Sequence, residues 1–229
     1  KLLDKFNQTA RLLKDEFQLR SERVEGDQLQ AMEPTLKPGL AGGWYFPDDV
    51  HVRPDRLMSS WRVQLEKQGV HVRENCEFGQ LVRERDRVVA VVAGGEEFDV
   101  DELVIATGAL TPLLARQLGC RLPIQPGKGY SITMPRPQPC PTMPLVFVQH
   151  KVAASPMVSG YRLGSMMEFN GYDSRIKPRR LQLLREAAEQ YLEEPYSEPI
   201  EEEWYGWRPM TSDGVPFIDR LPGLENAWV

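Results

Sequence analysis

The segment that most constrains the fold is the nearly continuous apolar strand Glu102–Ala106, which is followed by Thr107 and Gly108. A strand of this kind is typical of a parallel sheet in which both faces are buried. The small residue and the glycine at its end allow a ligand to approach the backbone, at the carboxyl edge where doubly wound sheets bind cofactors. An ordinary core strand with a tight turn explains the same residues, so the segment predicts a parallel sheet and leaves the ligand open.

Length and composition exclude several classes of protein. A chain of 229 residues forms one large domain or two small ones, and 41% hydrophobic with 27% charged residues is ordinary for a globular protein. The net charge of −5 argues against a general nucleic-acid binder. Three widely spaced cysteines favour a reducing compartment, and no apolar run approaches the roughly 18 residues of a transmembrane segment. We therefore expect a cytoplasmic protein, with peripheral association at the inner membrane left open.

Periodicity predicts a mixed α/β fold. Residues 1–20 have helical spacing, and Pro54 opens a second helix in which Leu57, Trp61 and Leu65 are expected to form a buried stripe. Pro178 opens a third helix. Strands are predicted over 44–46, 78–84, 88–93, 97–100, 127–134, 145–149 and 161–168, with a hairpin turn at Gly94–Gly95.

A second segment carries a candidate binding residue. Residues 204–218 begin as an aromatic strand, and Arg208 stands directly before Pro209. The proline holds Arg208 in extended backbone, from which the guanidinium can bind a carboxylate through two parallel hydrogen bonds. An arginine stacked on Trp207 at the surface explains the residues equally well. Both interpretations stay open from chemistry alone.

Other kinds of site are not supported by any motif. His51, His71 and His150 do not have the spacing of metal ligands, so we predict no metal site. No GxSxG motif is present for a serine nucleophile. Residues 127–129 begin like a dinucleotide loop, but Ile132 stands where the third glycine belongs. We name no catalytic residue.

Four segments in order resemble one family. They are 43–57 (GWYFPDDVHVRPDRL), 104–112 (VIATGALTP), 126–134 (PGKGYSITM) and 206–218 (GWRPMTSDGVPFI). Together they are similar to the FAD-dependent D-amino-acid dehydrogenase and glycine oxidase (DAO) family of flavoproteins, and the resemblance covers essentially the whole chain. Asp219 departs from the family's glycine at that position, and the family's GxGxxG unit and closing segment have no counterpart here. Because the chain opens inside an amphipathic pattern and closes on an apolar run, we expect it to be an interior fragment of a longer protein.

The resemblance implies two interleaved parts. Residues 46–124 and 206–229 would form a partial FAD-binding domain, and residues 1–45 and 125–205 a substrate domain with a mixed or antiparallel sheet. Arg208 would bind the substrate carboxylate, while Met166 and His150 would line the pocket. Thr107 and Gly108 would lie near the dinucleotide, and Phe78 near the adenine.

The implied reaction is oxidation of the C–N bond of an amino acid, favoured as a D-amino acid, by hydride transfer to FAD. One alternative is a secondary-amine oxidase or dehydrogenase acting on glycine, sarcosine or proline. The other is a non-catalytic fragment without bound cofactor. The electron acceptor, the exact substrate and the oligomeric state do not follow from the sequence.

Overall fold

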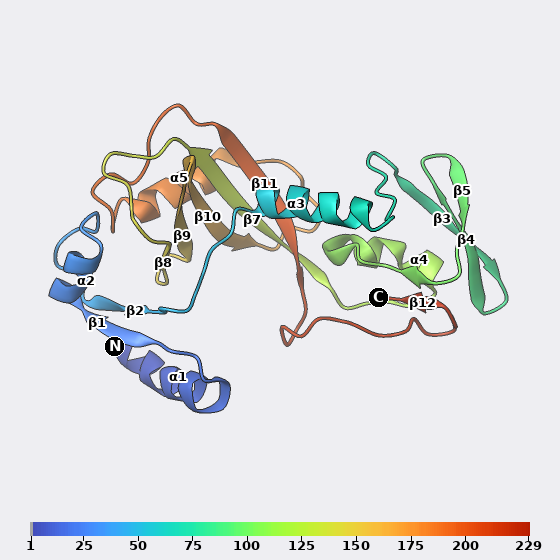
Figure 1. Cartoon of the computed structure of the whole chain (residues 1–229), viewed down its shortest axis with the longest axis horizontal. Coiled ribbons are helices and arrows are strands. Elements are labelled where there is room, and N and C mark those ends of the chain that lie inside the picture. Colours follow the sequence, from blue (N-terminus) through green and yellow to red (C-terminus); the bar gives the residue numbers. More distant parts are fainter. Residues whose placement is uncertain (1) are drawn as a thin grey trace. The chain divides into compact units, whose positions relative to one another are not determined.

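The computed structural model describes residues 2–229 as a mixed α/β chain that forms two compact units (Figure 1). Unit 1 comprises residues 2–55, 130–166 and 175–205. Unit 2 comprises residues 56–129, 167–174 and 206–229. Each unit is therefore assembled from three separate stretches of the chain.

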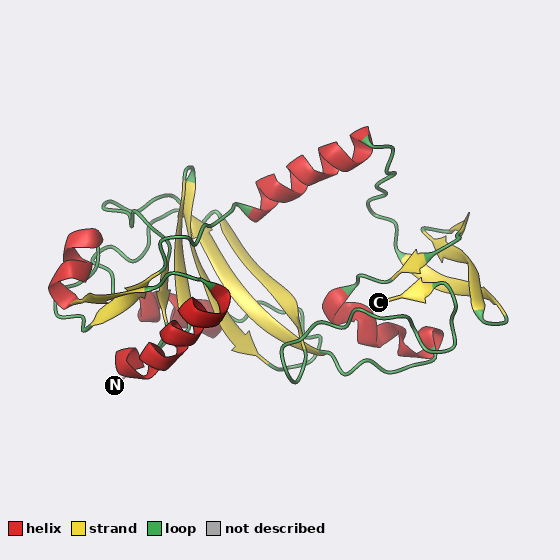
Figure 2. Ribbon diagram, turned by 60° about the horizontal axis from the view of Figure 1, so that its bottom comes forward, coloured by secondary structure: helices red, strands yellow, loops and turns green. Residues whose placement is uncertain are grey.

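The largest sheet has five strands in the order β11–β7–β10–β9–β8, and Figure 2 shows them as a twisted array. The strands are β7 (Gln125–Met134), β8 (Leu145–Phe147), β9 (Val152–Met157), β10 (Gly160–Glu168) and β11 (Glu202–Met210). β8, β9 and β10 pair antiparallel, and β11 lies at one edge. β7, β10 and β11 each contain residues of both units. The sequence predicts all of these strands except β9, where Pro156 argues against a strand.

The core of unit 1 lies between this sheet and helix α5 (Pro178–Ala188). Leu181, Leu184 and Ala188 form the buried face of the helix. They belong to one cluster with apolar side chains of β7, β8, β9 and β10, which include Tyr130, Ile132, Phe147, Val152, Tyr161 and Leu163. The apolar face of this helix is therefore buried as its spacing predicts.

Four smaller elements form the start of unit 1. Helix α1 (Leu2–Phe17) confirms the predicted first helix. Strands β1 (Glu22–Glu25) and β2 (Gly42–Tyr45) pair antiparallel, and helix α2 (Gly26–Met32) lies between them in sequence. Phe6 of α1 contacts Trp44 of β2 with ring centroids 5.1 Å apart.

A buried carboxylate joins two distant segments of unit 1. Glu33 is 0% exposed, and its Oε1 accepts hydrogen bonds from the hydroxyl (2.6 Å) and backbone N–H (3.3 Å) of Thr35. Its Oε2 accepts from the backbone N–H and the hydroxyl of Thr142, each at 2.7 Å. Burial by itself raises the pKa of the Glu33 carboxyl, but these hydrogen bonds outweigh it and the pKa lies below its ordinary value. Glu33 is thus an ionised connector between residue 35 and the loop at 142.

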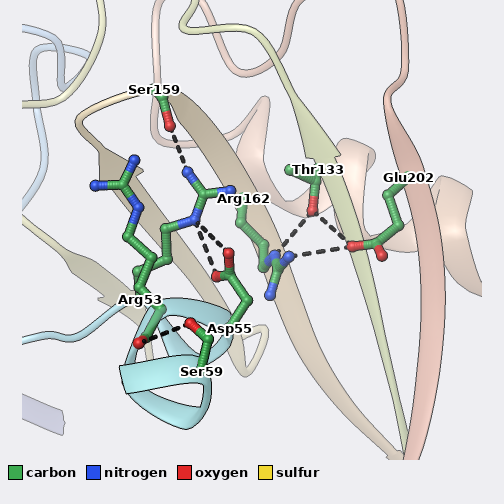
Figure 3. A network of polar contacts seen from close by, with 8 residues as sticks. Arg53, Asp55, Ser59, Thr133, Ser159, Arg162 and Glu202 are labelled. Atoms are coloured by element: carbon green, nitrogen blue, oxygen red, sulfur yellow. Dashed lines mark hydrogen bonds and ion pairs between the residues drawn. The ribbon is translucent and has the colours of Figure 1, made fainter. Parts of the chain in front are cut away.

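Unit 1 has two networks of polar side-chain contacts, which Figure 3 shows. Arg162 of β10 donates from Nε to the hydroxyl of Thr133 on β7 (2.9 Å) and from Nη2 to Glu202 of β11 (3.1 Å). This contact runs across three neighbouring strands. In the second network, Arg53 pairs with Asp55 (2.9 Å) and also donates to the hydroxyl of Ser159.

Unit 2 contains a three-stranded antiparallel meander and a short parallel pair. The meander consists of β3 (Phe78–Glu84), β4 (Arg87–Ala93) and β5 (Glu96–Asp99). Gly94 and Gly95 have φ values of 60° and 83°, which confirms the predicted hairpin between β4 and β5. The parallel pair consists of β6 (Leu103–Val104) and β12 (Ala227–Trp228).

The side chain of Asn226 connects the meander to the parallel pair. Asn226 is 0% exposed, and its Nδ2 donates to the carbonyl oxygens of Val88 and Asp101, each at 2.8 Å. Its Oδ1 accepts from the backbone N–H of Val88 at 2.9 Å. The core of unit 2 is one cluster of buried apolar side chains: Val88, Ile105, Leu118, Leu221, Leu224 and Ala227.

Two burial predictions in this region are wrong. The predicted strand 102–106 does pair in parallel, but β6 has only two residues and Val104 is 68% exposed. A two-stranded pair leaves one face uncovered, which the apolar sequence does not reveal. Helix α3 (Pro54–Lys67) begins at Pro54 as predicted, but its expected buried stripe is exposed: Leu57 47%, Trp61 59% and Leu65 37%. Helical spacing identifies residues that share a face and does not identify what covers it.

Candidate active site

The guanidinium of Arg208 lies against the backbone of the neighbouring strand β7. Arg208 is an exposed residue near the end of β11, directly before Pro209, as the sequence predicts for an extended residue. A Cβ atom placed on Gly129 of β7 would lie 2.8 Å from both Cζ and Nη2 of Arg208, and nearer still to Nη1. The guanidinium therefore occupies the space that any side chain at position 129 would need.

Gly127 lies two residues before Gly129, so the two glycines share one face of β7. A Cβ atom at position 127 would meet Cγ of Met210 at 2.7 Å and the sulfur of Met167 at 2.5 Å. Neither glycine has a positive φ. The two residues thus leave a bare face of β7, and side chains from the neighbouring strands lie on it.

A buried lysine stands between these glycines. Lys128 is 0% exposed, and its ammonium donates to the backbone carbonyl of Asp173 at 2.7 Å. Asp173 belongs to the segment 167–174, which unit 2 takes from the end of β10 and the turn after it. In the same segment, the amide nitrogen of Asn170 donates to Glu168 at 3.2 Å. Lys128 therefore holds this segment to β7 through a backbone contact.

Tyr172 holds the same segment on another side. Its hydroxyl donates to the carbonyl oxygen of Ala109 at 2.8 Å, and its ring meets Trp207 edge-on with centroids 5.6 Å apart and an interplanar angle of 77°. Burial raises the pKa of the Tyr172 phenol, so the hydroxyl keeps its proton at neutral pH. Tyr172 contacts both the turn after β6 and the residue that precedes Arg208.

The turn after β6 contains two of the predicted cofactor-binding residues. The backbone enters the 3₁₀ helix η1 (Gly108–Leu114) at Gly108, whose φ of 54° is left-handed and favours glycine. The hydroxyls of Thr107 and Thr111 lie 2.9 Å apart and share a hydrogen bond. Helix α4 (Ala115–Leu118) follows and ends at Gly119, whose φ of 71° is left-handed. This arrangement places a glycine turn at the carboxyl end of a parallel strand, where α/β sheets bind dinucleotides.

The other predicted site residues lie apart along the chain. Phe78 is the half-buried first residue of β3 in unit 2, where it pairs with Ala93. Met166 and His150 belong to unit 1. Met166 has a φ of 63° and packs against the core of that unit, while Nδ1 of His150 lies 2.7 Å from the hydroxyl of Tyr191. Unit 2 therefore brings together Arg208, Thr107 and Gly108, with Phe78 on its meander.

Three residues beside Arg208 were not predicted as part of the site: Lys128, Gly129 and Tyr172. The motif at 127–129 was noted and set aside because it fails as a dinucleotide loop. The glycines of this motif instead leave room for side chains of the neighbouring strands. Tyr172 stands alone in a turn, without a periodic pattern that would identify it.

Comparison with known families decides the assignment. The family model DAO, FAD dependent oxidoreductase, matches residues 1–229. The chain belongs to this family. The predicted resemblance to this family of FAD-dependent oxidoreductases is therefore confirmed. The predicted mixed α/β fold class is confirmed as well.

Among curated relatives, the D-amino acid dehydrogenase of Paramagnetospirillum magneticum is 33% identical over 204 residues, which are 87% of this chain and 48% of that protein. The glycine oxidase of Pseudomonas putida is 32% identical over 199 residues, which are 86% of this chain and 54% of that protein. The chain thus spans about half the length of the curated relatives it matches.

Solved structures of the family share the fold. Glycine oxidase from Geobacillus kaustophilus aligns with a TM-score of 0.88 at 22% identity, covering 99% of this chain and 60% of that one. L-proline dehydrogenase from P. horikoshii aligns with a TM-score of 0.82 at 17% identity, covering 98% of this chain and 62% of that one. At these identities the likeness concerns the fold. Within residues 2–229, no helix is long and apolar enough to cross a membrane.

Proposed function

We propose that the intact protein oxidises the C–N bond of an amino acid, with a D-amino acid favoured, and that Arg208 binds the substrate carboxylate. Family membership supports the reaction class, and the position of Arg208 supports the role. An extended backbone at Arg208, fixed by Pro209, presents a guanidinium that lies against β7 and is exposed to solvent. An exposed guanidinium suits a carboxylate ligand, since Arg offers a planar fork of donors.

The residues of unit 2 fit a flavin dinucleotide. Gly108 has a left-handed φ of 54° at the carboxyl end of a parallel strand, so backbone without a side chain is presented where dinucleotides bind in α/β sheets. We propose that unit 2 is the FAD-binding part, that Thr107 and Gly108 contact the dinucleotide and that Phe78 lies near the adenine. FAD, when bound, supplies a two-electron acceptor for the hydride of the substrate's α-carbon.

The chain's own residues supply position. Arg208 neutralises the substrate carboxylate and orients the α-carbon, while Tyr172 and Trp207 contact one another beside it. From the family resemblance alone, Met166 and His150 are proposed as substrate-binding residues. No side-chain base is assigned, because an amine that binds neutral needs none. The imino acid product is hydrolysed by water to a keto acid and ammonia.

The test is a steady-state assay of Arg208→Leu in the intact protein, with a panel of D-amino acids and N-methyl amino acids and an artificial dye acceptor. Losing a charge-assisted hydrogen bond costs about 1.5–3 kcal/mol, so kcat/KM falls about 10- to 100-fold, mainly through KM. Arg121→Leu, which removes an exposed arginine of the same unit, is the matched control. Unchanged kcat/KM in Arg208→Leu overturns the assignment.

The substrate panel also tests the reaction class. Higher kcat/KM with D-amino acids than with sarcosine, glycine or proline supports the D-amino-acid assignment, and the reverse order overturns it. The absorption spectrum of the purified protein tests the cofactor, because flavin bands that are absent even after FAD is added contradict a flavoprotein.

We propose a cytoplasmic location, in which any contact with the inner membrane is peripheral. The three free cysteines support a reducing compartment. Fractionation of the cells that produce the protein tests this location.

A further inference from the structure

Glycine at position 129 is not required by the backbone. Gly129 lies inside β7, between β11 and β10, and its φ is not in the left-handed region that favours glycine. A glycine inside a strand weakens the strand for two reasons. It has no side chain to pack, and its backbone loses more conformational entropy on folding than that of any other residue. The reason for this glycine therefore lies in what occupies the space beside it.

That space is filled by the guanidinium of Arg208. Cζ and Nη2 both lie 2.8 Å from the position of a Cβ at residue 129, well below the contact distances that real side chains show. The atoms in the way form the far end of a long flexible side chain, whereas a clash with backbone would block folding. A methyl group at position 129 consequently leaves the fold intact and moves the guanidinium.

We propose that Gly129 is a positioning residue for Arg208. Because Gly129 has no side chain, it sets where the Arg208 guanidinium lies, and hence where the substrate carboxylate binds. We call this guanidinium the carboxylate clamp. This inference rests on the proposed function of Arg208. Gly127 shares the same face of β7, but its side-chain space is taken by two methionines. The two glycines therefore serve different purposes, packing at position 127 and placement of a charged group at position 129.

The first experiment compares Gly129→Ala with Gly127→Ala in the intact protein. Both add one methyl group to the same face of the same strand, but only Gly129→Ala displaces the guanidinium. Misplacing a binding group by about 1 Å costs up to about 100-fold, so we expect KM for D-alanine to rise at least about 10-fold in Gly129→Ala, with kcat within about 2-fold. Gly127→Ala raises KM less than about 3-fold. Equal effects of the two substitutions on KM overturn the proposal.

A second readout does not depend on catalysis. Propionate has the carboxylate and carbon skeleton of D-alanine and lacks the oxidisable amine, so its Kd, measured by calorimetry, reports the clamp alone. Gly129→Ala weakens propionate binding by the same factor as it raises KM. A raised KM with an unchanged propionate Kd would show that position 129 acts on something other than the carboxylate, and would overturn the proposal.

A double-mutant cycle shows whether Gly129 acts through Arg208. In an Arg208→Ala background the guanidinium is gone, so adding Gly129→Ala changes neither kcat/KM nor the propionate Kd further. The melting temperature of the double variant is at least that of Gly129→Ala alone, because the clash is relieved, and this comparison holds even if the single variant folds poorly. Additive effects overturn the positioning role and leave the clamp intact. Arg208→Ala with unchanged kcat/KM overturns the clamp itself, and the positioning role with it.

Discussion

The phenol hydroxyl of Tyr172 donates a 2.8 Å hydrogen bond to the carbonyl oxygen of Ala109, one residue after the left-handed Gly108. The same ring contacts Trp207, the neighbour of Arg208. One side chain thus contacts both the turn proposed to hold the dinucleotide and the strand proposed to bind the substrate. The relative placement of these two segments is fixed within unit 2 by direct contacts.

Tyr172→Phe removes the hydrogen bond to Ala109 and keeps the ring against Trp207. We expect a loss of about 1 kcal/mol in unfolding free energy, together with faster amide exchange in the turn 107–110. Tyr172→Leu also removes the ring contact and costs about 1 kcal/mol more. Denaturant unfolding and hydrogen exchange by mass spectrometry measure both. Unaltered exchange in the turn would contradict the role of the hydroxyl.

Glu33→Gln tests the ionised connector of unit 1. The folded pKa of Glu33 is lowered, so its ionisation contributes stability above the ordinary value of 4.5 that is lost as pH falls through the lower folded value. Gln places an N–H₂ group among donors, and we expect a loss of about 2 kcal/mol at pH 7. The difference from wild type narrows below pH 4.5. Melting curves from pH 3 to 8 measure it, with exposed Glu201→Gln as the control; a difference independent of pH would argue against an ionised Glu33.

Asn226→Ala leaves two buried backbone groups, the N–H and the carbonyl of Val88, without the partner that Asn226 provides. It also removes one hydrogen bond to the carbonyl of Asp101, which still accepts from Arg87. Since each unsatisfied buried group costs about 1–3 kcal/mol, we expect a loss of about 3 kcal/mol or more in unfolding free energy. Asn226→Asp keeps the acceptor but loses both donors and buries a charge, so it is at least as destabilised at pH 7. Denaturant unfolding is the measurement, and a loss under about 1 kcal/mol would show that the bridge is dispensable.

Glu202→Gln tests the cross-strand contact drawn in Figure 3. The side chains of Glu202 and Arg162 are 51% and 30% exposed, so solvent screens their attraction. We expect a cost under about 1 kcal/mol that diminishes at 1 M salt. Thr133→Val, which removes the uncharged member, costs a similar amount but is insensitive to salt. Melting temperatures at two salt concentrations distinguish the two variants, and an equal salt response would contradict the screening argument.

Local patterns predicted the elements that are decided locally. The hairpin at Gly94–Gly95 and the helix start at Pro54 both follow from single-residue backbone preferences. Strand β9 was not predicted: its sequence contains Pro156 and two alanines, and its alternating burial becomes regular only with the neighbouring strands present. The exposure of Val104 was missed because a strand's sequence does not state how many neighbours it has.

The site divides in the same way. Arg208 was proposed from the sequence as a substrate-binding residue, because Pro209 follows it and because the family resemblance gives its motif a role. Gly129 was not, because its reason is the space required by a residue on another strand. Tyr172 and Lys128 likewise act through backbone carbonyls, of Ala109 and Asp173, which any residue type provides. Such contacts leave no pattern in the sequence of the accepting segment.

The Asn226 bridge has a consequence for synthesis of the chain. Its partners, Val88 and Asp101, precede it by more than a hundred residues, so their hydrogen bonds wait until the ribosome has released residue 226. Until then the meander β3–β5 can form its own ladder, but its polar backbone at Val88 is still hydrated. The core of unit 2 waits for the same stretch of chain, because Leu221, Leu224 and Ala227 pack in one cluster with Val88. Unit 2 is therefore completed only when its last segment has been synthesised.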